Sequence, residues 1–273
     1  MRVTASAGSF FIQLAGAPMS RRFFRYALIL ACIGFTVWSF AVTEFSWGKI
    51  WNGFLVQDAF RQFLAGLWPF NWEILDQVAW QSLVTIQIAW IGTLLSLIVA
   101  LPLSFAAARN AAPSLVLGWL TRFFFNFDRS VDVLIVALIF VSAIGLGPLA
   151  GTLAIAFHSI GSLGKLFTEA IESVDRGPVE GVESVGASPA QVIRWGLLPQ
   201  VVPYLISYTL YRLELNIRSA VVLGIVGAGG IGFLLLDNIR QFQYHNVSMI
   251  LVVIIVLVLI MDWGSARLRK MVA

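Results

Sequence analysis

Six long stretches of this 273-residue chain carry no Asp, Glu, Lys or Arg, and they limit what the chain can fold into. A membrane-spanning helix needs about 20 predominantly apolar residues. Lipid cannot bond to open backbone groups, so such a segment must be helical. We therefore predict an all-α polytopic membrane protein with about six transmembrane helices. The charge-free stretches are 26–43, 77–108, 133–164, 195–211, 219–236 and 241–261.

The supply of charge excludes the main alternatives to a membrane protein. Hydrophobic residues make up 59% of the chain and charged residues 12%, whereas a soluble domain carries about 25% charged residues. An ordinary soluble enzyme, a disordered chain and a collagen-like fibre are therefore excluded. The single cysteine, Cys32, cannot form an intrachain disulfide, and His158 and His245 lie far apart in sequence. We expect no metal site and no interaction with nucleic acid.

Two of the charge-free stretches are interrupted by glycine and proline. Residues 133–164 contain Gly145, Gly147 and Pro148, which predicts two short helices joined by a tight turn, the second continuing past Lys165. We interpret 219–236 as the end of the fifth span followed by a re-entrant or packed outer segment. A seventh full span there would place the basic C-terminal tail outside.

Basic residues predict the orientation, because Lys and Arg accumulate in cytoplasmic segments. With six spans, both termini are expected in the cytoplasm. The predicted organisation is a cytoplasmic tail at 1–25, a first transmembrane helix at 26–43, an external segment at 44–79, a core at 80–264 with a cytoplasmic loop at 176–198, and a cytoplasmic tail at 265–273. The predicted cytoplasmic basic residues are Arg2, Arg21, Arg22, Arg25, Arg109, Arg122, Arg129, Lys165, Arg176, Arg194, Arg267, Arg269 and Lys270, against Lys49, Arg61 and Arg240 outside.

The two ends of the first span have features of their own. The external segment holds Trp47, Trp51, Trp68 and Trp72; tryptophan favours the membrane–water interface, so they could anchor an interfacial helix or help dock an external partner. The first 20 residues faintly resemble a signal peptide, but we interpret them as a cytoplasmic tail. Met19 is an alternative start.

Two glycine motifs imitate nucleotide sites but lack their context. Residues 227–232 match G-x-G-x-x-G, yet the dinucleotide motif needs an acidic residue about 20 positions later, where this chain has a membrane span. The Gly-Lys pair at 164–165 lacks the remaining P-loop residues. We predict no ATP site and no catalytic site. Close helix packing or a gate is the better interpretation of Gly227, Gly229, Gly230 and Gly232.

Residues 177–199, GPVEGVESVGASPAQVIRWGLLP, predict two short helices in the cytoplasm. Pro178 suits the first helical position of one, and Ser188 with Gln191 forms a capping box for the other. Gly186 and Ala187 lie at the joint between them. Pro199 ends the second helix or opens the fifth span.

This segment resembles the coupling loop of ATP-binding-cassette (ABC) importer permeases, which has the form E-A-A, then Gly, then a hydrophobic-Leu-Pro ending. Glu180-Gly181-Val182, Gly186 and Leu198-Pro199 match that pattern, with glycine and valine in place of the two alanines. Residues 125–151, 163–188 and 198–232 are similar to the phosphonate permease family, which includes phosphite and hypophosphite permeases. That likeness covers roughly residues 70–270. A Val-Asp pair ending at Asp132 departs from the family's usual R-S-I/V-P-E.

The resemblance implies a fold, partners and a place in the cell. The fold would be that of a type I ABC importer permease in the bacterial inner membrane. Two copies would form the pore, two ATPase subunits would bind ATP and Mg²⁺, and an extracytoplasmic binding protein would deliver a phosphonate, phosphite or hypophosphite. This chain would hold no cofactor itself. Its coupling residues would be Glu180, Gly181, Gly186, Ala187, Ser188 and Pro199.

A polar cluster in the fifth span is the candidate translocation path. At about 100° per residue, Arg212, Asn216 and Ser219 share one helix face, whereas Glu214 and Arg218 share another. Charges in a membrane are costly and usually face a cavity or a partner. One face would line the path of an anion, and the other would pack through an ion pair. Either face is compatible with either role. A purely structural role for all five residues is also compatible with the pattern.

Three other functions are compatible with parts of this pattern. A permease of the same fold could carry another small solute such as an amino acid, since methionine-type permeases have a similar glycine-rich run. An ATP-independent channel would not need the cytoplasmic loop. An integral membrane enzyme would need a convergent acid–base or metal site, and the sequence contains none.

Overall fold

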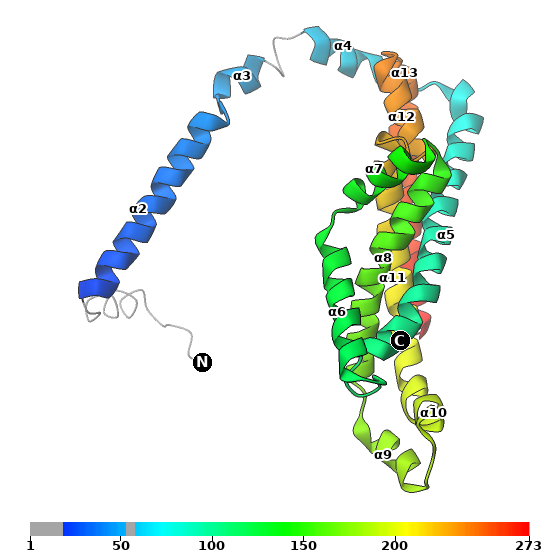
Figure 1. Ribbon diagram of the computed structural model, residues 1–273. Coiled ribbons are helices and arrows are strands. Elements are labelled where there is room, and N and C mark those ends of the chain that lie inside the picture. Colours follow the sequence, from blue (N-terminus) through cyan, green and yellow to red (C-terminus); the bar gives the residue numbers. More distant parts are fainter. Residues whose placement is uncertain (1–18, 53–57, 273) are drawn as a thin grey trace, which may run out of the picture. The chain divides into compact units, whose positions relative to one another are not determined.

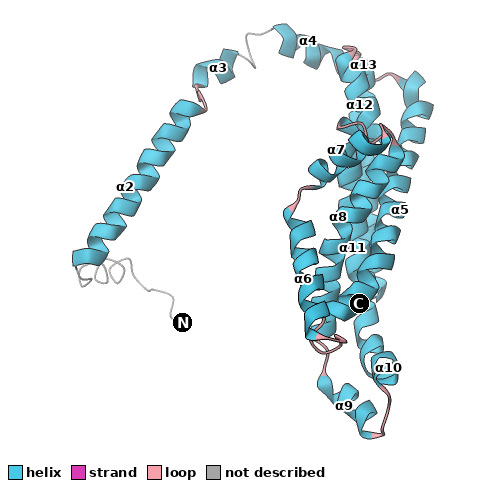
Figure 2. Cartoon of the chain, in the orientation of Figure 1, coloured by secondary structure: helices cyan, strands magenta, loops and turns pink. Residues whose placement is uncertain are grey.

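The computed structural model describes residues 19–52 and 58–272, and these are helical with no strand among them. Figures 1 and 2 show the helices and the short connections between them. The chain divides into two units, residues 1–64 and 65–273. This boundary falls within the predicted external segment. Most of the predicted N-terminal tail, residues 1–18, lies outside the described part.

The first unit contains one long apolar helix, α2 (Met19–Val42), which accounts for the predicted first span. Its side chains from Phe23 onward are exposed in nearly every direction, as expected of a helix that faces lipid. The hydroxyl groups of Thr36 and Ser39 donate to carbonyl oxygens one turn earlier, so they are satisfied without water. The short helix α3 (Trp47–Trp51) follows, with both tryptophans exposed, and α4 (Asp58–Gly66) leads into the second unit.

The second unit is a helix bundle whose long helices match the charge-free stretches. A short 3₁₀ turn, η2 (Trp72–Ile74), opens it. Across the described residues, five segments are long and apolar enough to cross a membrane. The bundle helices are α5 (Leu75–Ala107), α6 (Leu115–Ser130), α7 (Val133–Ile144), α8 (Pro148–Glu172), α11 (Leu198–Ile225), α12 (Gly230–Arg240) and α13 (Tyr244–Val272).

Helices α5, α6 and α8 pack closely because small residues stand where they meet. A Cβ atom at Gly92 of α5 would lie 2.7 Å from Cγ2 of Ile155 on α8. Gly164 of α8 faces the ring of Phe125 on α6, and Phe125 is 2% exposed. Small residues let membrane helices approach and gain van der Waals contact that lipid cannot supply.

The position of α6 differs from the predicted arrangement. The segment with Arg122 and Arg129 is predicted to be cytoplasmic, but it forms α6, which runs beside α8 (Figure 1) and carries Arg129 away from the elbow end of the bundle, where Arg122 stays. Near the end of α6, the Oδ2 atom of Asp128 accepts a hydrogen bond of 2.7 Å from the backbone N–H of Gly161, close to the midpoint of α8. By length, α6 and α7 measure about 24 Å and 18 Å. Neither spans a hydrocarbon core of about 30 Å alone, so together they make one broken crossing.

The other glycine-interrupted stretch is as predicted. Helix α11 ends at Ile225, a turn follows, and α12 begins at Gly230. Its 11 residues measure about 17 Å, too short to span. The predicted pair of helices within 133–164 is likewise confirmed as α7 and α8.

Candidate functional site

An elbow, residues 176–198, projects from the end of the bundle where α8 stops and α11 starts (Figure 1). It consists of α9 (Arg176–Ser184), α10 (Pro189–Gln191) and a π-helical turn, η3 (Val192–Leu197). The two predicted helices are present, but Pro178 is not the first helical residue. Helix α9 begins earlier, at Arg176, because Asp175 caps it: the Asp175 carboxylate accepts the N–H of Gly177 at 3.1 Å. Such a cap satisfies one of the free N–H groups of the first turn.

The joint of the elbow requires glycine. Gly186 has a φ of +78° and no atom near the position of a Cβ, so its backbone angle alone selects glycine. The predicted capping box follows: the side-chain Oε1 of Gln191 accepts the backbone N–H of Ser188 at 2.8 Å. Val185, beside the joint, is 81% exposed. The tip of the elbow is therefore a well-formed but uncovered surface.

Hydrogen bonds at its base hold the elbow in place. The side chain of Gln200 on α11 accepts the N–H of Asp175 at 3.1 Å and donates to the carbonyl of Gly196 at 2.8 Å. A groove lies between the elbow and the loop that joins α5 to α6. Its lining includes Pro113, Glu180 and Ala187. Two of the predicted coupling residues thus face one groove.

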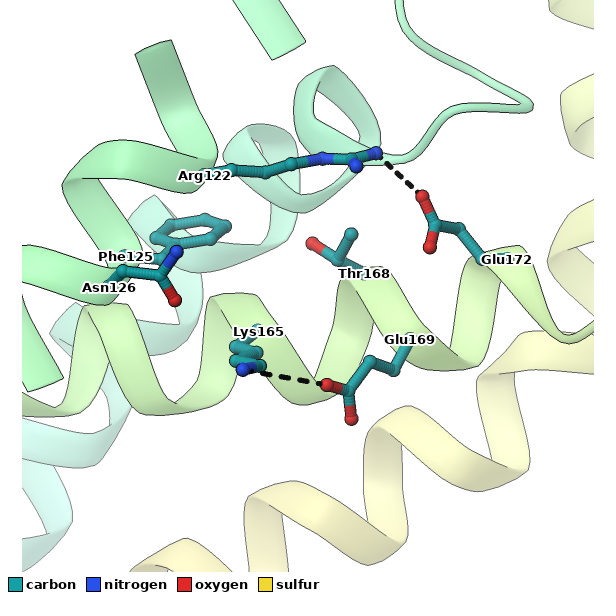
Figure 3. Close-up of a pocket in the computed structure, with 7 residues that line it drawn as sticks. All are labelled: Arg122, Phe125, Asn126, Lys165, Thr168, Glu169 and Glu172. Atoms are coloured by element: carbon teal, nitrogen blue, oxygen red, sulfur yellow. Dashed lines mark hydrogen bonds and ion pairs between the residues drawn. The ribbon is translucent and has the colours of Figure 1, made fainter. Parts of the chain in front are cut away.

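An ion-paired clamp joins three helices just above the elbow. Arg122 of α6 pairs with Glu172 of α8 at 2.6 Å and donates through Nε to the carbonyl of Ala107, the last residue of α5, at 2.8 Å. The same carboxylate oxygen accepts the N–H of Arg109 at 2.8 Å. Figure 3 shows this pair at one end of a pocket between α6 and α8, with Lys165 and the neighbouring acid on α8 at the other. Motion of the elbow would therefore be passed to α6 and α8 together.

The predicted polar face of α11 reaches into the middle of the bundle. Asn216 is 1% exposed, and its side-chain nitrogen donates to Thr93 of α5 and Ser159 of α8, both at 2.9 Å. Arg212 is half-buried near the midpoint of α11 and donates through Nε to the Ser159 hydroxyl at 3.1 Å. Ser219 lies half-buried about two turns beyond Arg212. Asn216 therefore ties three helices together, whereas Arg212 stands at the edge of that buried network.

The other predicted face carries an ion-pair network with α13. Glu214 is bonded to Arg218 at 3.0 Å and to Arg269 at 2.8 Å. Arg218 also pairs with Asp262 at 2.7 Å. Two acids and two arginines balance one another here. This pattern joins α11 to α13, and the partner residues on α13 could not be identified from the sequence.

The glycine-rich turn between α11 and α12 closes against the start of α8. Gly227 has a φ of +93°, and its carbonyl accepts the N–H of Gly147 at 2.9 Å. A Cβ at Gly224 would lie 2.6 Å from the Cα of Gly232. The N–H of Ile231 donates to the Thr85 hydroxyl of α5 at 2.8 Å. These glycines therefore stand where backbone segments approach one another closely, as predicted for close packing.

Replacing Gly232 with alanine should destabilise the bundle. The added methyl group would collide with the backbone carbonyl of Val221, which cannot move aside as a flexible side chain could, and overpacking of this kind costs about 1–3 kcal/mol. The melting temperature of the purified protein in detergent is expected to fall by several degrees. Gly264→Ala is the control, because nothing lies within 4 Å of a Cβ there. Equal melting temperatures for the two variants would contradict the packing argument.

Sequence reasoning missed the polar residues that α6 and α8 bring to the same depth. Asp128 is fully buried, Arg129 is exposed, and His158 is half-buried. The charges of Asp128 and Arg129 both act on Arg212. The only signal in the sequence was an Asp-Arg pair directly before an apolar helix, which the orientation rule assigned to a loop.

Comparison with known proteins agrees with this architecture. A family model described as binding-protein-dependent transport system inner membrane component matches residues 100–272. A phosphite transport system permease protein of Stutzerimonas stutzeri is 45% identical over 186 residues, 68% of each chain. A phosphate-import permease protein of Mycolicibacterium smegmatis is 40% identical over 186 residues, 68% of this chain and 35% of that one. An inward-facing structure of the MetNI methionine ABC transporter superposes with a TM-score of 0.65 at 18% identity, covering 75% of this chain and all of that one.

Proposed function

This chain belongs to the family of binding-protein-dependent transport system inner membrane components, and on that premise we propose that it carries a phosphorus oxyanion across the membrane. It is a multi-pass permease subunit of an ABC importer. The proposed substrate is a phosphonate, phosphite or hypophosphite. The observation that carries the substrate class is the 45% identity to a phosphite permease over two thirds of each chain. The structural likeness to a methionine transporter, at 18% identity, concerns the fold alone.

The position of Arg212 supports an anionic substrate. A planar guanidinium suits the oxygens of phosphorus oxyanions, and this one stands near the midpoint of α11 with a single side-chain hydrogen bond in the described part of the chain. We therefore assign the path to the face with Arg212, Asn216 and Ser219. Glu214 and Arg218, joined to α13, form the packing face.

The elbow is the proposed contact with the ATPase. Glu180, Gly181, Gly186, Ala187, Ser188 and Pro199 would form or position the surface that docks on it. ATP and Mg²⁺ would be bound and hydrolysed by two ATPase subunits, with no cofactor in this chain. The clamp between Arg122 and Glu172 lies directly above the elbow, so closure of the ATPases would swing α6 and α8 as a unit.

The proposed assembly is a homodimer in the bacterial inner membrane with both termini in the cytoplasm. The elbow and the C-terminal ends of α5 and α8 would face the ATPases, and the external segment at 44–79 would face the binding protein. The glycine turn at 227–232 would form or support the outer gate. Rocking of helix bundles about a central site is the general logic of such transporters.

Reconstituted transport tests the proposal. The permease would be placed in proteoliposomes with the ATPase and binding protein from the same source, and ATP-dependent uptake of labelled phosphite measured. Excess methylphosphonate, hypophosphite, phosphate and methionine serve as competitors, and a hydrolysis-deficient ATPase as the control. We expect phosphite uptake that phosphorus oxyanions inhibit. Methionine uptake without phosphite uptake would establish the amino-acid alternative, and uptake without ATP the channel.

A further inference from the structure

The crossing made by α6 and α7 is broken near the middle of the bundle. Helix α6 ends at Ser130 and α7 begins at Val133, where the Asp132 carboxylate caps it by accepting the N–H of Leu134 at 2.8 Å. The bond from Gly161 to Asp128 places this break beside the midpoint of α8. Non-helical backbone at membrane depth is tolerated where it is buried in protein or lines a cavity, and discontinuous helices commonly form transport sites.

Two arginines and a histidine, from three different helices, surround the break. Arg129 is exposed at the end of α6, and Arg212 of α11 is close enough for their charges to act on each other. The half-buried ring of His158, on α8, lies close enough to Asp132 for the charge of that carboxylate to act on it. The charge of Arg212 also acts on this ring. Two arginines thus stand near one another at a depth where charge is expensive.

Two polar atoms at the break lack partners. In the described residues, Oδ1 of Asp128 and Nδ1 of His158 are the only buried side-chain nitrogen or oxygen atoms without a hydrogen bond. Asp128 is 0% exposed, so this is not a solvated carboxylate. Buried polar groups are nearly always satisfied, and exceptions call for an explanation. Both exceptions here lie at the same break, beside the same pair of arginines.

We propose that the α6–α7 break is an intramembrane binding site for the transported phosphorus oxyanion, in which Arg129 and Arg212 bind its oxygens and His158 supplies a further polar contact. The site rests on the proposed function. It extends the path from α11 onto α6 and α8. Asp128 is a positioning residue: its carboxylate binds the N–H of Gly161 and offsets part of the arginine charge. That offset suits a transport site, which must release its ion as readily as it binds it.

The test compares the amount of phosphite transported per ATP hydrolysed in reconstituted complexes. Arg212→Gln and Arg129→Gln should each lower this ratio about ten-fold or more, since each variant loses a hydrogen bond between a charged donor and the anion. ATPase stimulation by the loaded binding protein and the melting temperature should stay near wild type. Arg212→Lys should keep part of the transport, because it retains the charge without the planar fork. Arg267→Gln, an exposed arginine near the end of α13, is the matched control.

The outcomes separate this site from the proposed function. Wild-type complexes that hydrolyse ATP but move none of phosphite, methylphosphonate and hypophosphite would refute the substrate class itself. Wild-type transport with an unchanged ratio in both Gln variants would overturn the site alone. If Arg212→Gln fails to assemble because its bond to Ser159 is lost, the result for Arg129→Gln is decisive, since an exposed side chain can be shortened without disturbing the core.

Discussion

Replacing Gly186 with valine should abolish ATP-driven transport while leaving the membrane bundle folded. The φ of +78° at this joint is nearly inaccessible to a β-branched residue. Holding an unsuitable residue there costs about 1–3 kcal/mol, and each 1.4 kcal/mol lowers the population of the docking geometry about ten-fold. Because no atom lies within 4 Å of a Cβ at Gly186, the substitution acts through the backbone of the elbow and not through a steric clash.

Two further variants make the Gly186 experiment specific. Gly186→Asn should retain part of the activity, since Asn tolerates positive φ better than most residues. Gly264→Ala, on α13 outside the elbow and also with nothing within 4 Å of a Cβ, should keep full activity because alanine favours helix. Capture of the ATPase by tagged permease, phosphite uptake and melting temperature would be measured for each. Full ATPase capture and uptake by Gly186→Val would show that the geometry of this joint does not matter for coupling.

The parts of the fold that local chemistry determines could be predicted from the sequence. The long helices α5, α8 and α13 coincide with charge-free stretches, because lipid forces an apolar segment to satisfy its own backbone. The elbow was predictable for a similar reason: the bond between Ser188 and Gln191 involves residues three apart. Pro178 indicates a start for α9 that is two residues too late. The residue that caps this helix, Asp175, lies just outside residues 177–199, from which the two helices are predicted.

The parts that depend on contacts between distant residues could not be predicted. Charge counting placed Arg129 in a cytoplasmic loop, whereas the bond between Asp128 and Gly161 joins residues 33 apart and holds α6 along α8. Helical periodicity correctly grouped Arg212 with Asn216. It gave no indication of Thr93 and Ser159, which come from α5 and α8. The candidate binding site at the break is assembled from such contacts alone.

The network around Glu214 gives a prediction that separates packing from transport. Its side chain is 11% exposed and accepts bonds from Arg218 and Arg269. Glu214→Gln would leave two arginines near a single remaining acid, Asp262. Removing one partner of a fully buried pair costs about 3–5 kcal/mol; because Arg218 is 44% exposed, we expect about 1–3 kcal/mol and a melting temperature lower by several degrees.

Comparison with Asp262→Asn sharpens the Glu214 test. That change leaves Arg218 bound to Glu214, so its effect on the melting temperature should be smaller. Phosphite uptake per correctly folded molecule, measured after size-exclusion chromatography, should be close to wild type in both variants if the network only joins α11 to α13. A Glu214→Gln protein that melts like wild type but has lost uptake would instead place this carboxylate on the translocation path. The face of α11 with Arg212 would then be the packing face, because the two faces point in nearly opposite directions.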